Sequence, residues 1–367
     1  MSDMTDGDSQ ASTEPFGIYM HVPFCASRCD YCAFATWTDR HHLIDDYLDA
    51  CRRQAAQAVA AGMKPVTSAF VGGGTPNLVP ADQLMAVLAE LPIEDGAEVT
   101  IECNPDEVTA EQMQTYAAGG VTRISLGVQS MVPSVLTTLG RHHDPANVRF
   151  ATECVRNAGI KRLNLDLIYG ATGETIEQWQ TSLTEAVALG PDHVSAYALT
   201  VEAGTPLADD PSRHPDDDVQ ADKYLMADEI LTAAGLTNYE ISNWATPDQE
   251  CQLNQLYWRQ GDYLGLGCAA HSHIEGRRFW SIRTPERFIK AIDEGTTTEA
   301  GSERLDPSER RLEALQLSIR TNEGVPAETV PVEVEHLVEV GVDGQARLTR
   351  DGRLLANEVA VRLTLKD

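Results

Sequence analysis

The chain has 367 residues, enough for one large domain and a smaller appendage, because single hydrophobic cores stop growing at about 250 to 300 residues. Its 56 acidic and 28 basic side chains give a formal net charge of -28 at pH 7. This excess of acid argues against nucleic acid as a partner, since binding to phosphates depends on Lys and Arg, and equally against an anionic membrane surface. Most of the charge is expected to form a solvated exterior.

Eight cysteines are present, and three of them are clustered, at Cys25, Cys29 and Cys32. The five scattered thiols do not form the framework of a disulfide-rich secreted protein and fit a reducing cytosol. Residues 1–15 are polar and acidic without the apolar core of a signal peptide, and no segment is long and apolar enough to cross a bilayer. The sequence therefore predicts a cytoplasmic protein with a disordered leader over residues 1–15.

The first predicted strand leads into the cysteine loop, because apolar side chains alternate with period two from Phe16 to Val22. Beyond it, helices and strands alternate along the chain. The predicted ranges are a helix at 43–61, a strand at 68–71, a helix at 80–91, a strand at 98–102, a helix at 110–118, a strand at 123–127, a helix at 147–158, a strand at 162–168, a helix at 175–189 and a strand at 193–200. Strands separated by helices imply right-handed crossovers and a parallel sheet, either open or wound into part of a barrel.

The pattern changes towards the C-terminus. A polar loop at 208–218 and a helix at 219–234 are predicted first, followed much later by a helix at 307–320. A hairpin is predicted with strands at 346–349 and 353–355 around an Asp351-Gly352 turn. This change places a small α+β domain at 303–367, after a barrel domain with an extension at 16–302.

The three clustered cysteines are separated by three and two residues, a spacing that lets one tight loop direct three thiolates to a single centre. A structural zinc site would take four ligands, normally as two separated pairs, and no second Cys or His pair stands at the partner spacing. An iron–sulfur cube held by three thiolates leaves one iron free for another ligand. The alternative, unpaired cysteines in a loop, is disfavoured by their close clustering.

A glycine run, Gly72-Gly73-Gly74, directly follows the strand predicted at 68–71. Without a Cβ, backbone can approach a ligand closely and present its N–H groups, although glycine-rich turns are common and are weak evidence alone.

Polar side chains also stand at or near the ends of three successive strands, at Glu102, Gln129 and Asp166. A carboxylate inside an apolar strand is costly to bury, so these side chains predict a polar rim at the mouth of the barrel. The alternative for Glu102 is a surface side chain on a loop.

These motifs occur together, and in this order, in a known family. The cysteine loop resembles that of the radical S-adenosylmethionine (SAM) superfamily, in which the open iron binds the amino and carboxyl groups of SAM. The strings YMHVPFCxxxCDYCAF, GGGTP, IECNP, RISLGVQS, GRHHD and LDLIYG resemble the oxygen-independent coproporphyrinogen III oxidase-like family and, more narrowly, its heme chaperone branch, HemW. The resemblance covers about residues 16–300 and implies a partial (β/α)6 barrel with its active site at the carboxyl ends of the strands.

The resemblance also implies the site residues. Cys25, Cys29 and Cys32 would hold a [4Fe-4S] cluster. The positions that match SAM binding are Tyr19, Tyr31, Gly73, Gly74, Thr75, Glu102, Gln129, Arg141 and Asp166. The planar guanidinium of Arg141 suits the carboxylate of SAM, while the alternative for this residue is a surface ion pair.

Two features favour the heme chaperone branch. The coproporphyrinogen-oxidising members carry a further Cys two residues after the third ligand, where this chain has Phe34. The chaperone branch shows the string YEISN, which is present here at residues 239–243, and a Cys-x-His-Asn-x-x-Tyr-Trp stretch, in which Leu253 replaces the His. An aliphatic side chain cannot coordinate iron, so a heme ligand would have to be another residue. The candidates, each of which also suits a packed core or a surface, are Cys251, Cys268, His271 and His273.

The sequence thus predicts a radical SAM protein of the HemW type that binds a [4Fe-4S] cluster, SAM and heme, and delivers heme to acceptor hemoproteins. The alternative is an oxygen-independent coproporphyrinogen III dehydrogenase, which converts its substrate to protoporphyrinogen IX by oxidative decarboxylation. A third possibility is a relative that keeps the cluster and has lost heme handling together with the His that Leu253 replaces.

Overall fold

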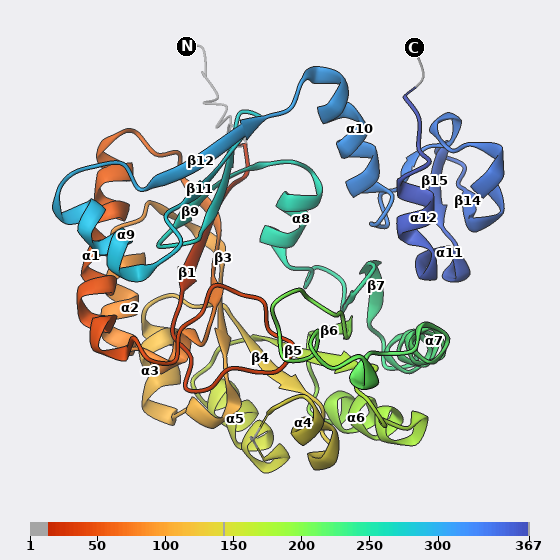
Figure 1. Cartoon of the computed structure of the whole chain (residues 1–367), viewed down its shortest axis with the longest axis horizontal. Helices are drawn as coiled ribbons and strands as arrows, with labels where there is room; N and C mark the ends of the chain where they lie inside the picture. The colour runs from red at the N-terminus through yellow and green to blue at the C-terminus, as the bar shows by residue number, and fades with distance from the viewer. Residues whose placement is uncertain (1–13, 142–143, 366–367) are drawn as a thin grey trace, which may run out of the picture.

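The structure, a computed structural model, describes residues 14–141 and 144–365, so the predicted leader lies almost wholly outside the described residues. A twelve-stranded sheet dominates it, and six parallel strands stand in sequence order at its centre, each followed by a helix (Figure 1). These elements are β1 (Phe16–Val22), α1 (Ile44–Ala60), β2 (Val66–Gly73), α2 (Ala81–Leu88), β3 (Ile93–Cys103), α3 (Ala110–Ala118), β4 (Arg123–Gln129), α4 (Pro133–Thr138), α5 (Pro145–Asn157), β5 (Arg162–Tyr169), α6 (Ile176–Ala188), β6 (His193–Ala198) and α7 (Asp217–Ala233). The predicted partial (β/α)6 barrel is confirmed.

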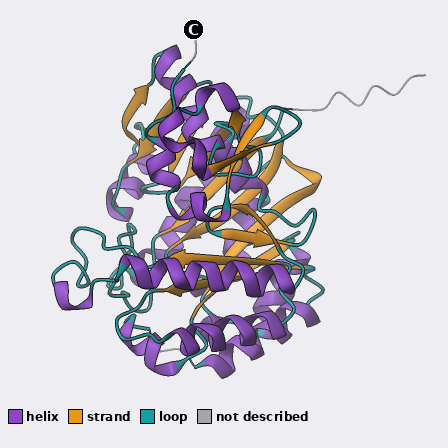
Figure 2. Ribbon diagram, turned by 90° about the vertical axis from the view of Figure 1, so that its right-hand side faces the viewer, coloured by secondary structure: helices purple, strands orange, loops and turns teal. Residues whose placement is uncertain are grey.

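Alternating side chains give the parallel strands two different faces. On β5, Leu163, Leu165 and Leu167 are fully buried in the main hydrophobic core, while Asn164 and Asp166 point into the barrel. Figure 2 shows long helices running outside the strands, where they cover the apolar faces. Polar groups are thereby collected inside the barrel, where each needs a partner.

Further strands extend both edges of the barrel. Beyond β1 lie β9 (Asp262–Leu266), which is parallel to it, and then an antiparallel set of β10 (His271–Ile274), β11 (Arg277–Ser281) and β12 (Glu299–Arg304). Beyond β6 lie β8 (Asn243–Ala245) and β7 (Thr237–Glu240), both antiparallel to their neighbours. Between the edges, α8 (Gln252–Trp258) packs on β1 and β2, and α9 (Pro285–Asp293) packs on α1.

The C-terminal region has a hydrophobic core of its own, built around Ile319, Val325 and Ala346. Its elements are α10 (Pro307–Ser318), β13 (Val325–Pro326), β14 (Val338–Val340), β15 (Gln345–Leu348), α11 (Arg350–Leu354) and α12 (Ala356–Ala360). The three strands form a separate small sheet in the order β13-β15-β14. The small α+β unit is confirmed, and its boundary near residue 303 stays a prediction.

The predicted hairpin in this unit is wrong. Asp351 and Gly352 lie inside α11, and β15 pairs with β13 and β14 instead of with residues 353–355. The Thr349 hydroxyl accepts a hydrogen bond from the Gly352 N–H and caps the helix. Gly352 is required because a Cβ there would lie 2.0 Å from the Leu337 carbonyl oxygen. The glycine serves close packing and not a turn.

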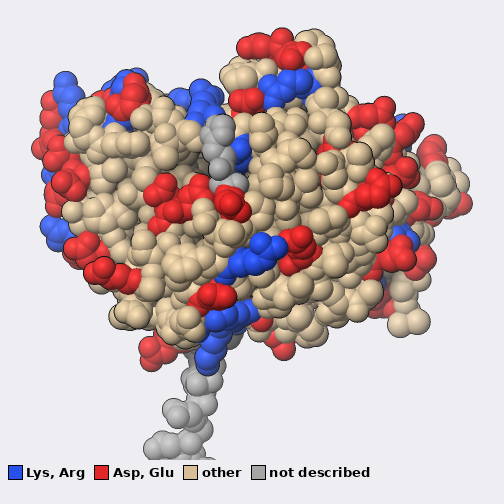
Figure 3. Space-filling model, turned by 90° about the horizontal axis from the view of Figure 1, so that it is seen from below, with Lys and Arg blue, Asp and Glu red and all other residues tan. Residues whose placement is uncertain are grey.

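Acidic side chains are spread over the face drawn in Figure 3, while basic side chains are fewer and gathered in small groups. Within residues 14–141 and 144–365, no helix has both the length and the apolar character required to cross a membrane.

Candidate functional site

The cysteine loop leaves the end of β1 and is fastened to the barrel by main-chain bonds. The Cys25 N–H donates to the Trp37 carbonyl, and the Trp37 N–H donates to the Pro23 carbonyl. His21 Nε2 donates to the Ala35 carbonyl at 2.9 Å, so its Nδ1 is free to accept from the Tyr19 hydroxyl at 3.3 Å. These hydrogen bonds fix both ends of the cysteine loop.

All three thiols of the loop are free and partly exposed. Burial raises the pKa of Cys25, and the neighbouring Cys29 and Cys32 raise this pKa further. The three sulfurs are therefore close enough to interact electrostatically. Among the side chains that the structure describes, no three or more of the types Cys, His, Asp and Glu are arranged to hold a metal ion. A cube differs from a single ion because each thiolate binds a different iron, which keeps the sulfurs farther apart. Three free thiols on one fixed loop fit that group.

The glycine run after β2 is joined to the cysteine loop through its backbone. The N–H groups of Gly74 and Thr75 donate to the carbonyls of Val22 and Phe24 at 2.8 and 2.7 Å. The Thr75 side chain also hydrogen-bonds the thiol of Cys25. Gly73 and Gly74 are thereby placed directly beside the first cysteine.

Arg141 approaches the second cysteine from the segment after α4. Its Nη1 lies 3.6 Å from Cys29 Sγ, and its Nη2 donates to the Gly127 carbonyl at 2.7 Å. The side chain of Gln129, a residue with φ of 62°, also reaches to within 3.2 Å of where a Gly127 Cβ would lie. The Tyr31 side chain shares a hydrogen bond with Cys29, and burial raises the pKa of Tyr31.

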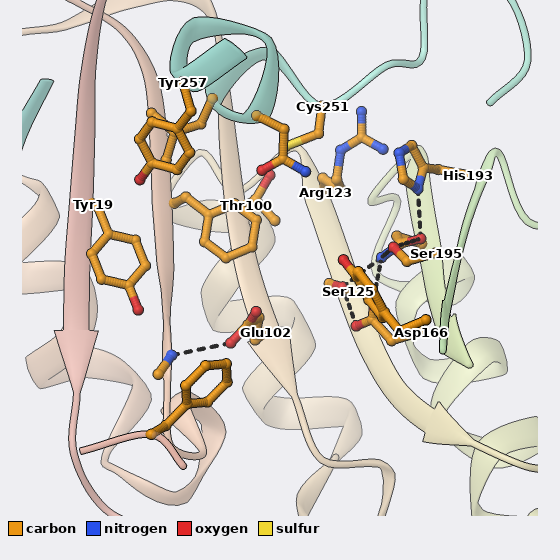
Figure 4. A pocket seen from close by; sticks show the side chains of 17 residues that line it. Tyr19, Thr100, Glu102, Arg123, Ser125, Asp166, His193, Ser195, Cys251 and Tyr257 are labelled. Carbon is orange, nitrogen blue, oxygen red and sulfur yellow. Dashed lines mark hydrogen bonds between the residues drawn. The ribbon is translucent and has the colours of Figure 1, made fainter. Parts of the chain in front are cut away.

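A cavity of about 220 Å³ lies inside the barrel. Its lining comes from all six parallel strands and from α8, and Figure 4 shows these side chains converging on it. Four of the predicted SAM positions line it, namely Tyr19, Gly73, Glu102 and Asp166. The other predicted SAM positions, Tyr31, Gly74, Thr75, Gln129 and Arg141, are not part of the lining, and most of them contact the cysteine loop or its neighbours instead.

Glu102 is the most perturbed acid in this cavity. Burial raises its pKa to about 8, the nearby charge of Asp166 contributes in the same direction, and the hydrogen bond from the Gly73 N–H at 3.1 Å opposes both. At neutral pH its carboxyl group is therefore mostly protonated. Glu102 is a partly buried side chain on β3 that lines the cavity, so the alternative of a surface side chain on a loop is wrong.

The floor of the cavity holds a chain of hydrogen bonds that the motifs did not predict. Asn164 donates to Asp166 Oδ1 at 2.8 Å and accepts from His193 Nδ1 at 2.7 Å. His193 Nε2 in turn accepts from the Tyr239 hydroxyl at 2.8 Å, and Tyr239 accepts the Cys251 N–H at 3.3 Å. The first residue of the YEISN string thus connects the strand floor to the start of α8. Polar residues at alternate positions on β5 and β6 were the available signal for this chain.

Beside that chain lies a second buried polar group. Arg123 and Arg162 both donate to Glu98, at 2.7 and 2.9 Å, and the Gln252 N–H adds a third bond to the same carboxylate. Arg123 Nη1 and the hydroxyl of its strand partner Thr100 have no hydrogen-bond partner among the described residues. Both residues line the cavity, so its floor offers donors to an occupant.

The four candidate heme ligands are dispersed. Cys251 lines the cavity, and Cys268 is buried beneath Tyr47, whose hydroxyl accepts the Cys268 N–H at 2.9 Å. His273 is buried, and its Nδ1 hydrogen-bonds the Gly261 carbonyl at 2.9 Å. His271 is exposed and stacks on Trp280.

Leu253, at the position of the family His, is buried in a small cluster near Tyr19 and Phe70. Its Cδ1 lies 2.4 Å from where a Cβ of Gly17 would be, so it packs closely on β1.

Comparison with known proteins agrees with this architecture. Residues 19–186 match the family model of the radical SAM superfamily. The heme chaperone HemW of Mycobacterium tuberculosis is 39% identical over 366 residues, covering 94% of each chain, and that of Escherichia coli is 38% identical over 287 residues, covering 75% of this chain and 76% of its own. The solved structure of E. coli coproporphyrinogen III oxidase (HemN), a radical SAM enzyme, superposes with a TM-score of 0.82 at 24% identity, over 95% of this chain and 90% of that one. That likeness establishes the fold.

Proposed function

Since this chain belongs to the HemW family of radical SAM proteins, we propose that it binds a [4Fe-4S] cluster, SAM and heme, and that it delivers heme to acceptor hemoproteins. The observation that carries the proposal is the fixed loop of three free, partly exposed thiols above a polar cavity. Such a cluster, when bound, supplies one-electron chemistry on SAM.

Different residues of this chain would bind the cluster and SAM. Cys25, Cys29 and Cys32 would hold the cluster, and the guanidinium of Arg141 beside Cys29 would neutralise part of its charge. SAM would then be bound by the predicted positions on the loop and in the cavity, which are Tyr19, Tyr31, Gly73, Gly74, Thr75, Glu102, Gln129, Arg141 and Asp166. The protonated carboxyl group of Glu102 can donate a hydrogen bond as well as accept one.

The alternative activity, oxidative decarboxylation of coproporphyrinogen III, is less well supported. Phe34 stands at the position of the additional Cys, is 64% exposed and lines the cavity. A phenyl ring offers neither a thiol nor a proton at the mouth, so a step that requires the extra cysteine has no group to perform it.

The partners that we propose are heme or a porphyrin and acceptor hemoproteins, and the proposed location is the cytoplasm. The location is supported by the cysteines, because all eight are free and five of them are buried as small apolar side chains.

The test is anaerobic reconstitution followed by heme transfer. The reconstituted protein should show the broad absorption of a [4Fe-4S] cluster, bind heme with a Soret band, and pass it to apomyoglobin. Cys29→Ala should lose the cluster, while Cys154→Ala, a substitution remote from the loop, should keep it. A flat heme titration of the reconstituted protein contradicts the proposal. Release of carbon dioxide from coproporphyrinogen III, with SAM and a reductant, favours the alternative.

A further inference from the structure

The segment between β6 and α7, residues 199–216, packs on the cysteine loop, although the sequence predicts only a polar loop in this part of the chain. We infer that Arg213 in this segment is a positioning residue for the iron–sulfur cluster. It binds Asp30, the residue that directly follows Cys29, and thereby keeps Cys29 in place. This inference rests on the cluster binding proposed above.

Three segments of the chain meet at Arg213. Its Nη2 donates to Asp30 Oδ2 at 2.8 Å and to the Thr138 carbonyl at 2.7 Å. The Thr172 hydroxyl, in the loop after β5, donates to the Arg213 carbonyl at 2.5 Å. Arg213 therefore connects the cysteine loop, the end of α4 and the loop after β5.

Both acceptors of the guanidinium lie next to groups at the second cysteine. Asp30 is the chain neighbour of Cys29, and Thr138 stands shortly before Arg141, whose Nη1 lies 3.6 Å from Cys29 Sγ. Gly140 packs on the same carboxylate, because a Cβ there would come within 2.9 Å of Asp30 Oδ1. One guanidinium thus fixes the segment of the thiol and the segment of its neighbouring cation relative to each other.

The same segment binds the backbone of the cysteine loop as well. The Leu207 N–H donates to the Asp30 carbonyl at 3.0 Å. The Leu207 side chain is buried in a small hydrophobic cluster with Leu139 and Leu199, against which Tyr31 of the cysteine loop packs. Both the main chain and the side chain of Asp30 are therefore bound by residues 199–216.

The ion pair is too exposed to contribute much to the stability of the fold. The side chains of Arg213 and Asp30 are 25% and 33% exposed, and ion pairs at such sites have small effects on unfolding. Groups that orient a metal ligand without touching the metal have larger effects on binding, commonly tenfold or more in affinity. The loss of Arg213 should therefore affect the cluster much more than the fold.

Iron retention by the reconstituted full-length protein tests this inference. Arg213→Met keeps an unbranched side chain and removes both hydrogen bonds. Under anaerobic conditions it should release iron to the chelator bathophenanthroline about tenfold faster than the parent protein. Arg213→Lys keeps the positive charge and should release iron more slowly than Arg213→Met. Asp30→Asn should also accelerate release, and the double variant should be no faster than Arg213→Met, because both changes remove the same contact.

Arg156→Met is the matched control. Arg156 also donates to one carboxylate, that of Asp192, and to main-chain carbonyls, those of Lys161 and Gly190, and its side chain is 36% exposed. These contacts lie at the amino ends of β5 and β6, the opposite end of the barrel from the cysteine loop. Arg156→Met should therefore retain iron as the parent protein does. Urea unfolding of each cluster-free variant measures the effect on the fold separately.

The outcomes separate the two proposals. If the parent protein assembles a cluster and Arg213→Met releases iron at the parent rate, the assignment of Arg213 is wrong and the proposed function stands. If Arg156→Met releases iron as fast as Arg213→Met, the effect arises from the stability of the fold, and the assignment is also wrong. If the parent protein assembles no cluster, the proposed function fails and the assignment fails with it.

Discussion

At the scale of single residues, the cavity is notable for an acid that does not ionise at its usual pH. Glu102 is surrounded by the barrel and faces Asp166, and its single backbone donor, the Gly73 N–H, compensates only partly for the loss of water. An uncharged carboxyl group is a better neighbour for a substrate carboxylate than a charged one. The same residue therefore makes the stability of the protein depend on pH.

Glu102→Gln should remove that dependence. The pKa of Glu102 is about 8 in the folded protein and 4.5 in the unfolded chain, so the folded state holds the proton more tightly and loses stability as pH rises from 4.5 to 8. The Gln side chain does not titrate and can still accept from the Gly73 N–H. We expect the variant to gain on the order of 3 kcal/mol over the parent protein between these pH values. Urea unfolding of the cluster-free proteins at pH 5 and pH 8 measures it, and parallel pH profiles would contradict it.

At the scale of elements, the glycine run and the cysteine loop form one unit. The sequence predicts that these glycines admit a ligand, and the structure gives them a packing role in addition. A Cβ on Gly73 would lie 2.3 Å from His21 Nδ1, and a Cβ on Gly74 would lie 2.6 Å from the Phe24 carbonyl oxygen. The glycines are needed because the loop that carries the cysteines packs directly on them.

Gly73→Ala should consequently lower the free energy of unfolding by much more than the positive φ of Gly73 alone explains. Gly62 is the matched control, since it has φ of +90° against +108° for Gly73 and nothing within 4 Å of its Cβ position. Gly62→Ala should lower the free energy of unfolding by about 1 kcal/mol, and Gly73→Ala by at least about 2 kcal/mol more, because His21 must move. Chemical denaturation of both variants makes the comparison, with iron content after reconstitution as a second measurement. Equal losses in the two would mean that the contact with His21 has no energetic weight.

At the scale of the whole molecule, the C-terminal unit is fastened to the barrel by ion pairs and a main-chain bond. Arg353 binds Asp228 of α7 through two bonds of 2.9 and 3.0 Å, and Trp244 Nε1 donates to the same carboxylate. The Asn322 N–H donates to the Tyr239 carbonyl, so the residue that closes the floor of the cavity also carries the C-terminal unit. A displacement of that unit would be transmitted to the cavity through Tyr239.

Arg353→Met should loosen this attachment. Its partner Asp228 is 8% exposed and keeps a second ion pair with Arg350 at 3.2 Å, so the loss of Arg353 should lower the free energy of unfolding by about 1 to 3 kcal/mol. Arg362→Met breaks the exposed pair with Glu358 and should change stability by less than about 0.5 kcal/mol. Limited proteolysis should cut Arg353→Met sooner than the Arg362→Met control between α9 and α10. Identical cleavage rates would show that the ion pair does not hold the unit in place.

Much of this architecture could be predicted because each signal was local. The alternation of strands and helices from residue 16 to residue 234 follows from periodicity, and the cysteine loop follows from spacing. The strands that extend the two edges could not be predicted, because β9 and β8 are defined by partners far away in the chain. The parts played by Arg123 and His193 could not be predicted for the same reason, because their hydrogen-bond partners, near α8 and at Tyr239, are also far away in the chain. The turn predicted at Asp351-Gly352 is wrong because Gly352 is required by its close packing on Leu337 and not by a turn.

The pairing of β1 with β9 has a consequence for biosynthesis. β1 is made before the other strands, and one of its edges pairs with β2, but its other edge is matched to residues 262–266, which emerge after all six parallel strands. Until then the nascent chain presents the cysteine loop beside an unpaired strand edge. The order of synthesis therefore completes this sheet only after the cysteine loop and all six parallel strands have emerged. Truncated chains that end before residue 262 should thus accept iron poorly, however well their helices form.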